Sequence, residues 1–171
     1  PPYSAKQNNE DGNQIRVNYP NLDRCLRKDW IETSTATNKN GLLDSYIRAL
    51  RWSANQLKGN GVIGFITNSS FLDGVAMDGM RKSLVKEFSD IYVIDLKGQI
   101  RRRSREQTKI EGENIFDIMT GVAITILIKD ESYEGDGNVH YLNVGNSLSK
   151  QDKLHNLVNW RSIAHVKERF I

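Results

Sequence analysis

The run Val62-Ile63-Gly64-Phe65-Ile66-Thr67 decides the fold of this chain. It is short and almost continuously apolar, which is typical of a strand buried on both faces of a sheet. Apolar residues at helical spacing follow over residues 75–88 and predict a helix. A second strand-like run, Ile91-Tyr92-Val93-Ile94-Asp95-Leu96, comes next. Strand, helix and strand in this order predict a βαβ unit with a parallel pair of strands and a right-handed crossover.

Two further strands are expected after this unit. The apolar run 122–128 has no helix before it, so we expect it to lie antiparallel to the strand at 91–96. A weaker strand is expected at 139–144, whereas residues 97–115 predict a polar and basic excursion from the sheet. The predicted fold class is therefore α/β, a Rossmann-like half-sheet that contains a parallel βαβ unit and an antiparallel strand.

The residues before the first strand predict two helices. An apolar stripe at helical spacing over 43–57 indicates an amphipathic helix. A shorter helix is expected over 22–32, with Asn21 as its N-cap. At the other end of the chain, residues 146–171 show no clean period, and we interpret them as the start of a following segment.

The composition limits the class of protein. Lys and Arg number 24 against 21 Asp and Glu, and this net charge of +3 is compatible with a nucleic-acid partner without requiring one. The single cysteine, Cys25, excludes an intrachain disulfide, and the three histidines show no metal-ligand spacing. No apolar stretch approaches the roughly 20 residues that span a bilayer. We therefore expect a cytoplasmic protein that holds no metal and contacts no membrane.

The candidate ligand site follows from the predicted topology. Ligands of open α/β sheets bind beyond the carboxyl ends of the parallel strands. Asn68, Ser69 and Phe71 follow the first strand, so we take them as candidate substrate-binding residues. Each has an alternative: Phe71 is also suited to the core, and Asn68 and Ser69 are also suited to the turn between strand and helix.

The densest group of cations lies in the excursion that follows the second strand. Arg101, Arg102, Arg103 and Arg105 occur within five residues. Such a loop at the edge of the sheet predicts contacts with DNA phosphates, whose strength depends on salt. A solvated loop is the alternative, because three glutamates follow closely and offset the charge.

The first residues of the chain have a distinctive backbone. Pro1 and Pro2 fix φ near −65° at successive positions and lack N–H groups, so they form neither a helix interior nor a central strand. The resulting stiff turn holds Tyr3 in one direction, where its ring is suited to stacking on a flat ligand. A frayed terminus is the alternative reading of these residues.

Pro1-Pro2-Tyr3 resembles the end of the Asn-Pro-Pro-Tyr motif of amino-directed adenine DNA methyltransferases. The order of elements that follows is also similar to that family. A helix leads to a strand that ends in Thr67-Asn68-Ser69-Ser70-Phe71, then come a helix, a strand, and Phe116 before the last strong strand.

Three longer stretches resemble the methyltransferase segment of large single-chain restriction–modification enzymes. They are Tyr19 to Asp23, Ser34 to Asn40, and Asp44 to Trp52. Those enzymes join nuclease, helicase-like ATPase, methyltransferase and target-recognition parts. The resemblance covers roughly residues 1–145.

The resemblance implies a reaction and the roles of several residues. A methyl group passes from S-adenosylmethionine to the exocyclic amino group of an adenine that has left the duplex. The family pattern assigns catalytic roles to Pro1, Pro2 and Tyr3: the Pro1 carbonyl accepts a hydrogen bond from the amino group, and Tyr3 stacks on the base. Phe116 corresponds to an aromatic residue that packs on the opposite side of the base.

Parts of the family pattern are absent from these 171 residues, namely the Asn before Pro1 and the upstream glycine-containing cofactor loop. We therefore interpret residues 1–145 as the catalytic half of a methyltransferase domain, and we expect the cofactor to bind mainly to the upstream half. The expected partners are double-stranded DNA and the other domains of the same polypeptide. Residues 1–171 alone are expected to be inactive and to self-associate through an exposed edge strand. The alternative is a non-catalytic α/β module that binds DNA or a partner domain.

Overall fold

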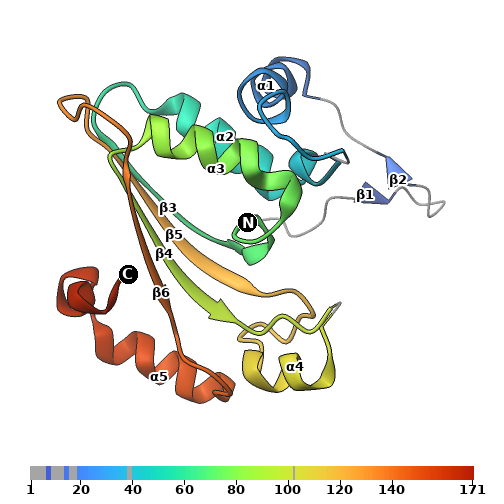
Figure 1. The fold of residues 1–171 in the computed structure, drawn as a ribbon, viewed down its shortest axis with the longest axis vertical. Coiled ribbons are helices and arrows are strands. Elements are labelled where there is room, and N and C mark those ends of the chain that lie inside the picture. The colour runs from blue at the N-terminus through green and yellow to red at the C-terminus, as the bar shows by residue number, and fades with distance from the viewer. Residues whose placement is uncertain (1–6, 9–13, 16–18, 38–39, 102) are drawn as a thin grey trace.

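The structure is a computed structural model that describes residues 7–8, 14–15, 19–37, 40–101 and 103–171. A four-stranded mixed sheet lies between two helical layers (Figure 1). Its strands are β3 (Gly61–Asn68), β4 (Asp90–Lys97), β5 (Val122–Lys129) and β6 (Asn138–Asn143). A separate antiparallel pair is formed by β1 (Gln7–Asn8) and β2 (Gln14–Ile15).

The strand order is β3-β5-β4-β6, which corrects one expectation and confirms another. β5 is antiparallel to β4, as predicted. However, β5 also pairs antiparallel with β3 along its full length, so β3 and β4 run parallel without being neighbours. The predicted parallel pair is therefore wrong in its hydrogen bonding, because β5 lies between the two strands. β6 extends the sheet beside β4 as its one parallel pair among the described residues.

β3 is an edge strand with one open face, which corrects the prediction that both of its faces are buried. Val62 and Ile66 are 63% and 40% exposed, whereas Ile63 and Thr67 are buried. The apolar run alone does not reveal this difference, because hydrophobicity does not specify which strands gain a neighbour on each side.

Helices cover both faces of the sheet. α1, α2 and α3 lie on one side of it, and α4 and α5 lie on the other (Figure 1). The α-helices are α1 (Pro20–Leu26), α2 (Ser45–Gln56), α3 (Asp78–Glu87), α4 (Arg105–Glu111) and α5 (Lys150–Trp160). A π-helical turn continues α1 over Arg27–Ile31, and short 3₁₀ turns cover Asn40–Leu43, Ser69–Phe71, Val75–Met77 and Ile163–Arg169.

The first helix begins earlier than predicted, and Asn21 is not its cap. Tyr19 occupies the N-cap position and Pro20 the first helical position, where the missing N–H has no cost. Asp23 accepts a hydrogen bond from the Tyr19 amide at 3.2 Å. The Asp23 carboxylate also pairs with Arg48 of α2, Oδ1 to Nε at 2.8 Å, and so joins the two helices.

α4 and α5 are helices in segments for which the sequence showed no periodicity. Each begins with a capping box, in which the side chain of the first residue and that of the residue three positions later bond to each other's amides. In α4 these residues are Ser104 and Gln107, and in α5 they are Ser149 and Asp152. The boxes satisfy the free N–H groups of helices that have few apolar residues.

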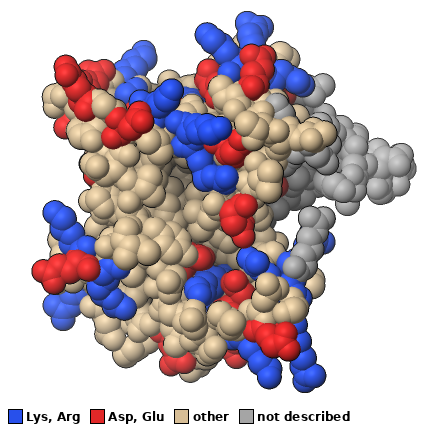
Figure 2. All heavy atoms as spheres, in the orientation of Figure 1, with Lys and Arg blue, Asp and Glu red and all other residues tan. Residues whose placement is uncertain are grey.

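Two apolar clusters hold the layers to the sheet. On one face, Trp30, Tyr46, Met80, Phe88 and Leu127 belong to a cluster formed by α1 to α3 and the strands. The second cluster packs α5 and the last 3₁₀ turn against β4 and β6. Charged side chains gather over the helical layers, and a mostly uncharged band lies between them on the face seen in Figure 2.

Residues 146–171 pack on this same sheet. The backbones of Tyr141 and Ile171 exchange two hydrogen bonds of 2.9 Å at the outer edge of β6. The proposed division at residue 145 stays a prediction. Among the helices that the structure describes, none is both long and apolar enough to cross a membrane.

Candidate functional site

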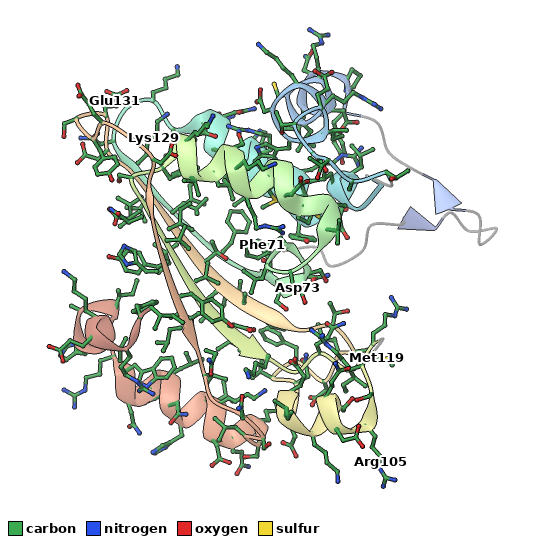
Figure 3. The ribbon with its side chains drawn as sticks, in the orientation of Figure 1. Phe71, Asp73, Arg105, Met119, Lys129 and Glu131 are labelled. Atoms are coloured by element: carbon green, nitrogen blue, oxygen red, sulfur yellow. The ribbon has the colours of Figure 1, made fainter. Side chains whose placement is uncertain are left out.

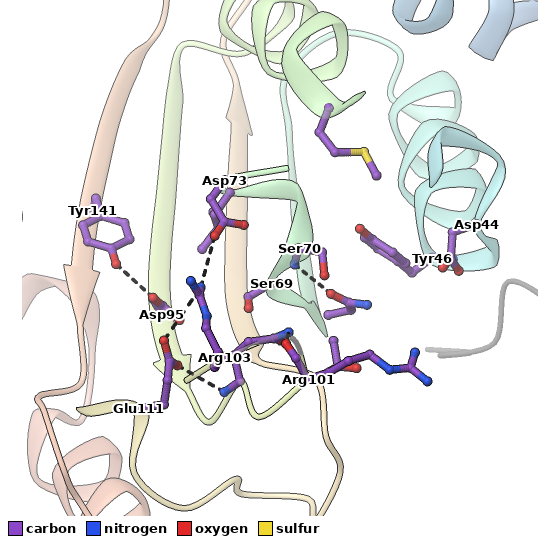
Figure 4. Close-up of a pocket in the computed structure, with 15 residues that line it drawn as sticks. Asp44, Tyr46, Ser69, Ser70, Asp73, Asp95, Arg101, Arg103, Glu111 and Tyr141 are labelled. Atoms are coloured by element: carbon purple, nitrogen blue, oxygen red, sulfur yellow. Dashed lines mark hydrogen bonds and ion pairs between the residues drawn. The ribbon is translucent and has the colours of Figure 1, made fainter. Parts of the chain in front are cut away.

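A polar pocket with a volume of about 870 Å³ opens at the carboxyl ends of β3 and β4 (Figure 4). Asn68, Ser69 and Ser70 line it from the turn after β3. Asp95 and Gln99 line it from the end of β4 and the segment that follows. Because these two strands run parallel, their ends meet at one edge of the sheet, and the pocket lies at the edge where the topology predicts a ligand site.

Asn68 and Ser69 shape the turn and also line the pocket. The Asn68 Oδ1 accepts a hydrogen bond from the Ser70 amide at 2.7 Å, and the Ser69 amide donates to the Gly121 carbonyl at 2.9 Å. A side chain at Gly121 would place its Cβ only 2.4 Å from the Ser69 Oγ. Glycine at position 121 therefore allows the start of β5 to approach this turn. The roles of both residues toward a substrate stay predictions.

Phe71 and Phe116 are not brought to the pocket. Phe71 is 5% exposed and belongs to the core cluster, which is the alternative that the sequence also allowed, and its substrate-binding assignment stays a prediction. Phe116 is 48% exposed, lies before β5 and is not among the described residues that line the pocket. Its amide donates to the Asn114 Oδ1 at 2.9 Å. The structure therefore gives no support to a shared base-binding surface of Phe116 with Asn68.

The arginines of the excursion differ in their surroundings. Arg101 and Arg103 line the pocket, whereas Arg105 points away from the sheet at the start of α4 (Figure 3). The Arg103 Nη2 lies 3.2 Å from the Asp73 Oδ2 and 3.9 Å from the Glu111 Oε1. In the described part of the chain Arg101 has no acidic partner, and its side chain extends away from Asp73 and Glu111 (Figure 4). Arg102 lies outside the described residues.

Two tyrosines in the pocket wall are held in their neutral form. Burial, followed by the charge of Asp95, raises the pKa of Tyr141, whose hydroxyl donates to the Asp95 Oδ2 at 2.9 Å. Burial also raises the pKa of Tyr46, and its buried hydroxyl has no partner among the described residues. Burial further raises the pKa of Asp44, which caps α2 beside Tyr46. The pocket therefore combines neutral phenols with carboxylates and guanidinium groups.

Tyr46, Asp95 and Tyr141 line the pocket but are not among the site residues predicted from the sequence. Tyr46 belongs to the apolar stripe of α2, and Tyr141 lies in the weakest strand, so neither has a sequence signal for a site. Asp95 did have a signal, because it is the one charged residue in the apolar run 91–96. A carboxylate at the end of a buried strand indicates a position where the sheet opens to solvent.

The described lining residues contain neither histidine nor cysteine. Across the described chain, no group of three or more histidine, cysteine or acidic side chains is arranged to hold a metal ion. Pro1, Pro2 and Tyr3, which carry the predicted catalytic turn, lie outside the described residues. The described lining residues therefore offer hydrogen-bonding and charged groups, and no activated side-chain nucleophile is found among them.

The fold and the pocket define an α/β protein with a partial Rossmann-like sheet and a polar site at the strand ends. No protein-family model and no curated protein sequence matches the chain. Among solved structures, all of this chain is similar to part of the ATP-dependent Type ISP restriction-modification enzyme LlaBIII bound to DNA. The identity is 61%, the TM-score is 0.96, and the match covers 11% of that chain.

Two further DNA complexes have the same fold. A nuclease-deletion mutant of the Type ISP restriction-modification enzyme LlaGI, in complex with a DNA substrate mimic, is 38% identical over 96% of this chain and 16% of its own, with a TM-score of 0.88. The DrdV–DNA complex is 38% identical over 91% of this chain and 15% of its own, with a TM-score of 0.82. The chain thus spans less than a fifth of each of these proteins. The predicted similarity to large restriction–modification enzymes is confirmed at this level.

Proposed function

We propose that this chain is the catalytic half of an adenine-specific DNA methyltransferase within a restriction–modification enzyme. The reaction transfers a methyl group from S-adenosylmethionine to the exocyclic amino group of a flipped-out adenine. One observation carries the proposal: a polar pocket lies at the carboxyl ends of β3 and β4, in a chain that is 61% identical along its length to part of a DNA-bound restriction–modification enzyme. Its volume of about 870 Å³ lies within the usual range for small-ligand pockets.

The proposed chemistry requires acceptors and a stacking surface more than a nucleophile. The adenine amino group is a poor nucleophile because its lone pair is delocalised into the ring. Acceptors such as the Pro1 carbonyl favour a more tetrahedral nitrogen, whose lone pair then points toward the electrophilic methyl group. Stacking on Tyr3 contributes on the order of 1–3 kcal/mol, which is comparable with the few kcal/mol lost when the base leaves the duplex.

The three described arginines of the excursion are expected to contribute unequally to DNA binding. Arg101 is the strongest candidate for a phosphate contact, because it lines the pocket and has no acidic partner among the described residues. Arg105 adds a second cation on the outside of α4. Arg103 is largely neutralised by Asp73 and Glu111, so it contributes less to phosphate binding.

The described residues suit the DNA side of the reaction better than the cofactor side. S-adenosylmethionine, when bound, supplies the methyl group as an electrophile. No glycine-rich turn leads from a strand into a helix within the described ranges, and such turns let the backbone approach a nucleotide cofactor closely in Rossmann-like folds. We therefore propose that the cofactor binds mainly outside the described residues, and that the described residues bind and orient the base.

A methylation assay tests the proposal. The longest natural polypeptide that contains this sequence is incubated with DNA and S-adenosylmethionine carrying a labelled methyl group. We expect label on adenine, a loss of at least 100-fold for Tyr3→Ala, and little change for the control Tyr133→Ala, which lies in the exposed turn between β5 and β6. The 171 residues alone are expected to transfer no label.

The alternative, a non-catalytic α/β module, predicts a different outcome. In that case the polypeptide would bind DNA without labelling it, and Tyr3→Ala would give the same result as the wild type. Labelled cytosine in place of adenine would contradict the proposed base.

A further inference from the structure

Lys153 is a fully buried lysine that the proposed reaction does not use. It is 0% exposed and belongs to α5. Its ammonium group donates to three main-chain carbonyls, those of Leu96 at 2.9 Å, Glu111 at 2.9 Å and Glu113 at 2.7 Å. An ammonium group has three N–H donors, so every one of them is paired.

The three carbonyls lie at two places along the chain between β4 and β5: one where the chain leaves β4, and two at the end of α4 and just after it, where the chain turns back toward the sheet. Leu96 is at the end of β4, and Glu111 and Glu113 are the end of α4 and the residue shortly after it. Lys153 therefore ties α5 to both arms of the segment that carries the pocket arginines.

Glu111 extends this connection to the residues directly before Arg101. Its carbonyl accepts a hydrogen bond from the Gly98 amide at 3.3 Å, and its Oε2 accepts one from the Gln99 amide at 3.1 Å. The Gln99 Nε2 in turn donates to the Arg101 carbonyl at 2.8 Å. A continuous series of hydrogen bonds thus leads from Lys153 to the backbone of Arg101.

The net effect of the surroundings is to lower the pKa of Lys153, mainly through burial and also through the charge of Lys97. The nearby carboxylates of Glu111, Asp95 and Glu113 act in the opposite direction. Carbonyl acceptors also stabilise the charged form. α5 itself is fixed at this point, because the Lys150 amide donates to the Glu113 Oε2 at 2.7 Å and the Glu113 amide donates to the Leu148 carbonyl at 3.0 Å.

We propose that Lys153 is a positioning residue, which holds the segment 97–111 so that Arg101 faces the DNA. The placement of the segment concerns this chain alone, and the DNA contact rests on the proposed function. A residue after position 145 would then determine where Arg101 lies relative to bound DNA.

The first test is hydrogen–deuterium exchange of the longest natural polypeptide that contains this sequence. We expect Lys153→Met to speed amide exchange in peptides from 97–111 by about tenfold, with β3 peptides unchanged. Lys150→Met is the matched control, since it makes the same substitution on the same helix at a half-buried position whose Nζ pairs only with Asp117 among the described residues. Unchanged exchange in Lys153→Met would overturn the proposal. The measurement needs no DNA, so it decides the placement even if the methylation assay fails.

The second test is a double-mutant cycle on DNA affinity. Lys153→Met is expected to weaken DNA binding about tenfold, and Arg101→Ala is expected to add less than about twofold in that background, because residues that act through one another are not additive. Equal effects of Arg101→Ala in both backgrounds would contradict the positioning role. If Lys153→Met speeds exchange in β3 as well, Lys153→Gln, which keeps two N–H donors, replaces it in both tests.

Discussion

The Arg103 guanidinium, from the segment after β4, lies 3.2 Å from the Asp73 carboxylate, from the turn after β3. The same guanidinium lies 3.9 Å from Glu111 at the end of α4. One cation of the basic stretch is therefore used within the protein, where it connects the two loops that border the pocket. The pair is largely exposed, so its contribution to stability is modest, and its effect is to fix geometry.

Arg101→Ala is expected to lower the affinity for DNA and to make that affinity less dependent on the salt concentration. Loss of one phosphate contact lowers the slope of log affinity against log salt by about 0.9. Arg103→Ala should change the slope less, because Asp73 and Glu111 already offset its charge. Fluorescence anisotropy with labelled DNA at several salt concentrations measures both slopes.

The control for this comparison is Lys129→Ala, at the end of β5 farthest from the pocket (Figure 3). It should leave the slope unchanged. An equal reduction for all three variants would indicate general charge attraction and no specific contact by Arg101.

Asp78→Asn is expected to alter the pH dependence of stability. Hydrogen bonds from the Ser34 hydroxyl and from the amide and hydroxyl of Thr35 lower the pKa of Asp78 below its usual value of 3.8. Because the folded-state pKa is the lower one, the stabilisation is complete above the unfolded-state pKa and is lost as the pH falls through the folded-state value.

Urea unfolding of the 171-residue chain at several pH values tests this expectation. Asp78→Asn should lower the midpoint at neutral pH and flatten its decline below about pH 4. Asp136→Asn, in the exposed turn between β5 and β6, is the control and should keep the wild-type profile. A profile for Asp78→Asn parallel to the wild type would show that Asp78 titrates equally in both states.

Glu87→Gln is expected to destabilise the fold by about 2 kcal/mol, because it removes the carboxylate that makes the closest ion pair with the buried Arg51 side chain. The Arg51 side chain is 5% exposed, and its two terminal nitrogens each lie 2.7 Å from a Glu87 carboxylate oxygen. Lys86→Gln, one residue away on the exposed side of α3, should change the free energy of unfolding by less than about 0.5 kcal/mol. Arg51 also lies 4.0 Å from the Asp29 Oδ2, and its Nε donates to the Asn55 Oδ1 at 2.9 Å. Equal midpoints in urea for both variants would mean that these two contacts compensate fully for the lost carboxylate.

The positions of the strands could be predicted from the sequence, but the order in which they pair in the sheet could not. The strands at 61–68, 90–97 and 122–129 were recognisable because each is an apolar run between turn residues. Their order was not, because the insertion of β5 between β3 and β4 depends on which backbones pair. α4 and α5 were not predicted because their residues show no apolar periodicity. The capping pairs Ser104/Gln107 and Ser149/Asp152 are the sequence signals that mark their first turns.

The residues of the candidate site that directly follow a strand could be predicted from the sequence, whereas those from distant elements could not. Asn68 and Ser69 follow directly from a strand end, so the topology rule finds them. Tyr46 and Tyr141 come from a helix and an outer strand, and only the folded chain brings both to the pocket. Lys153 comes from a late helix and reaches the end of β4 only in the folded chain. Phe71 had two readings in the sequence, and the structure places it in the core cluster.

The open face and edge of β3 are expected to cause self-association of the 171-residue chain. Val62 and Ile66 are exposed on the face where Val62 pairs with Ile128 and Ile66 with Ile124 of β5. No described strand pairs with the outer edge of β3, and unpaired edges with apolar side chains favour pairing between molecules.

Val62→Lys should reduce this association, because a lysine on an edge strand cannot be buried at low cost against a second copy. Val158→Lys is the control, since Val158 is 73% exposed on α5, away from β3. Sedimentation velocity across a series of concentrations should show a rise in sedimentation coefficient for the wild type and Val158→Lys, and a smaller rise for Val62→Lys. A single monomeric species for the wild type at every concentration would contradict the prediction, and an equal rise for both variants would move the contact away from β3.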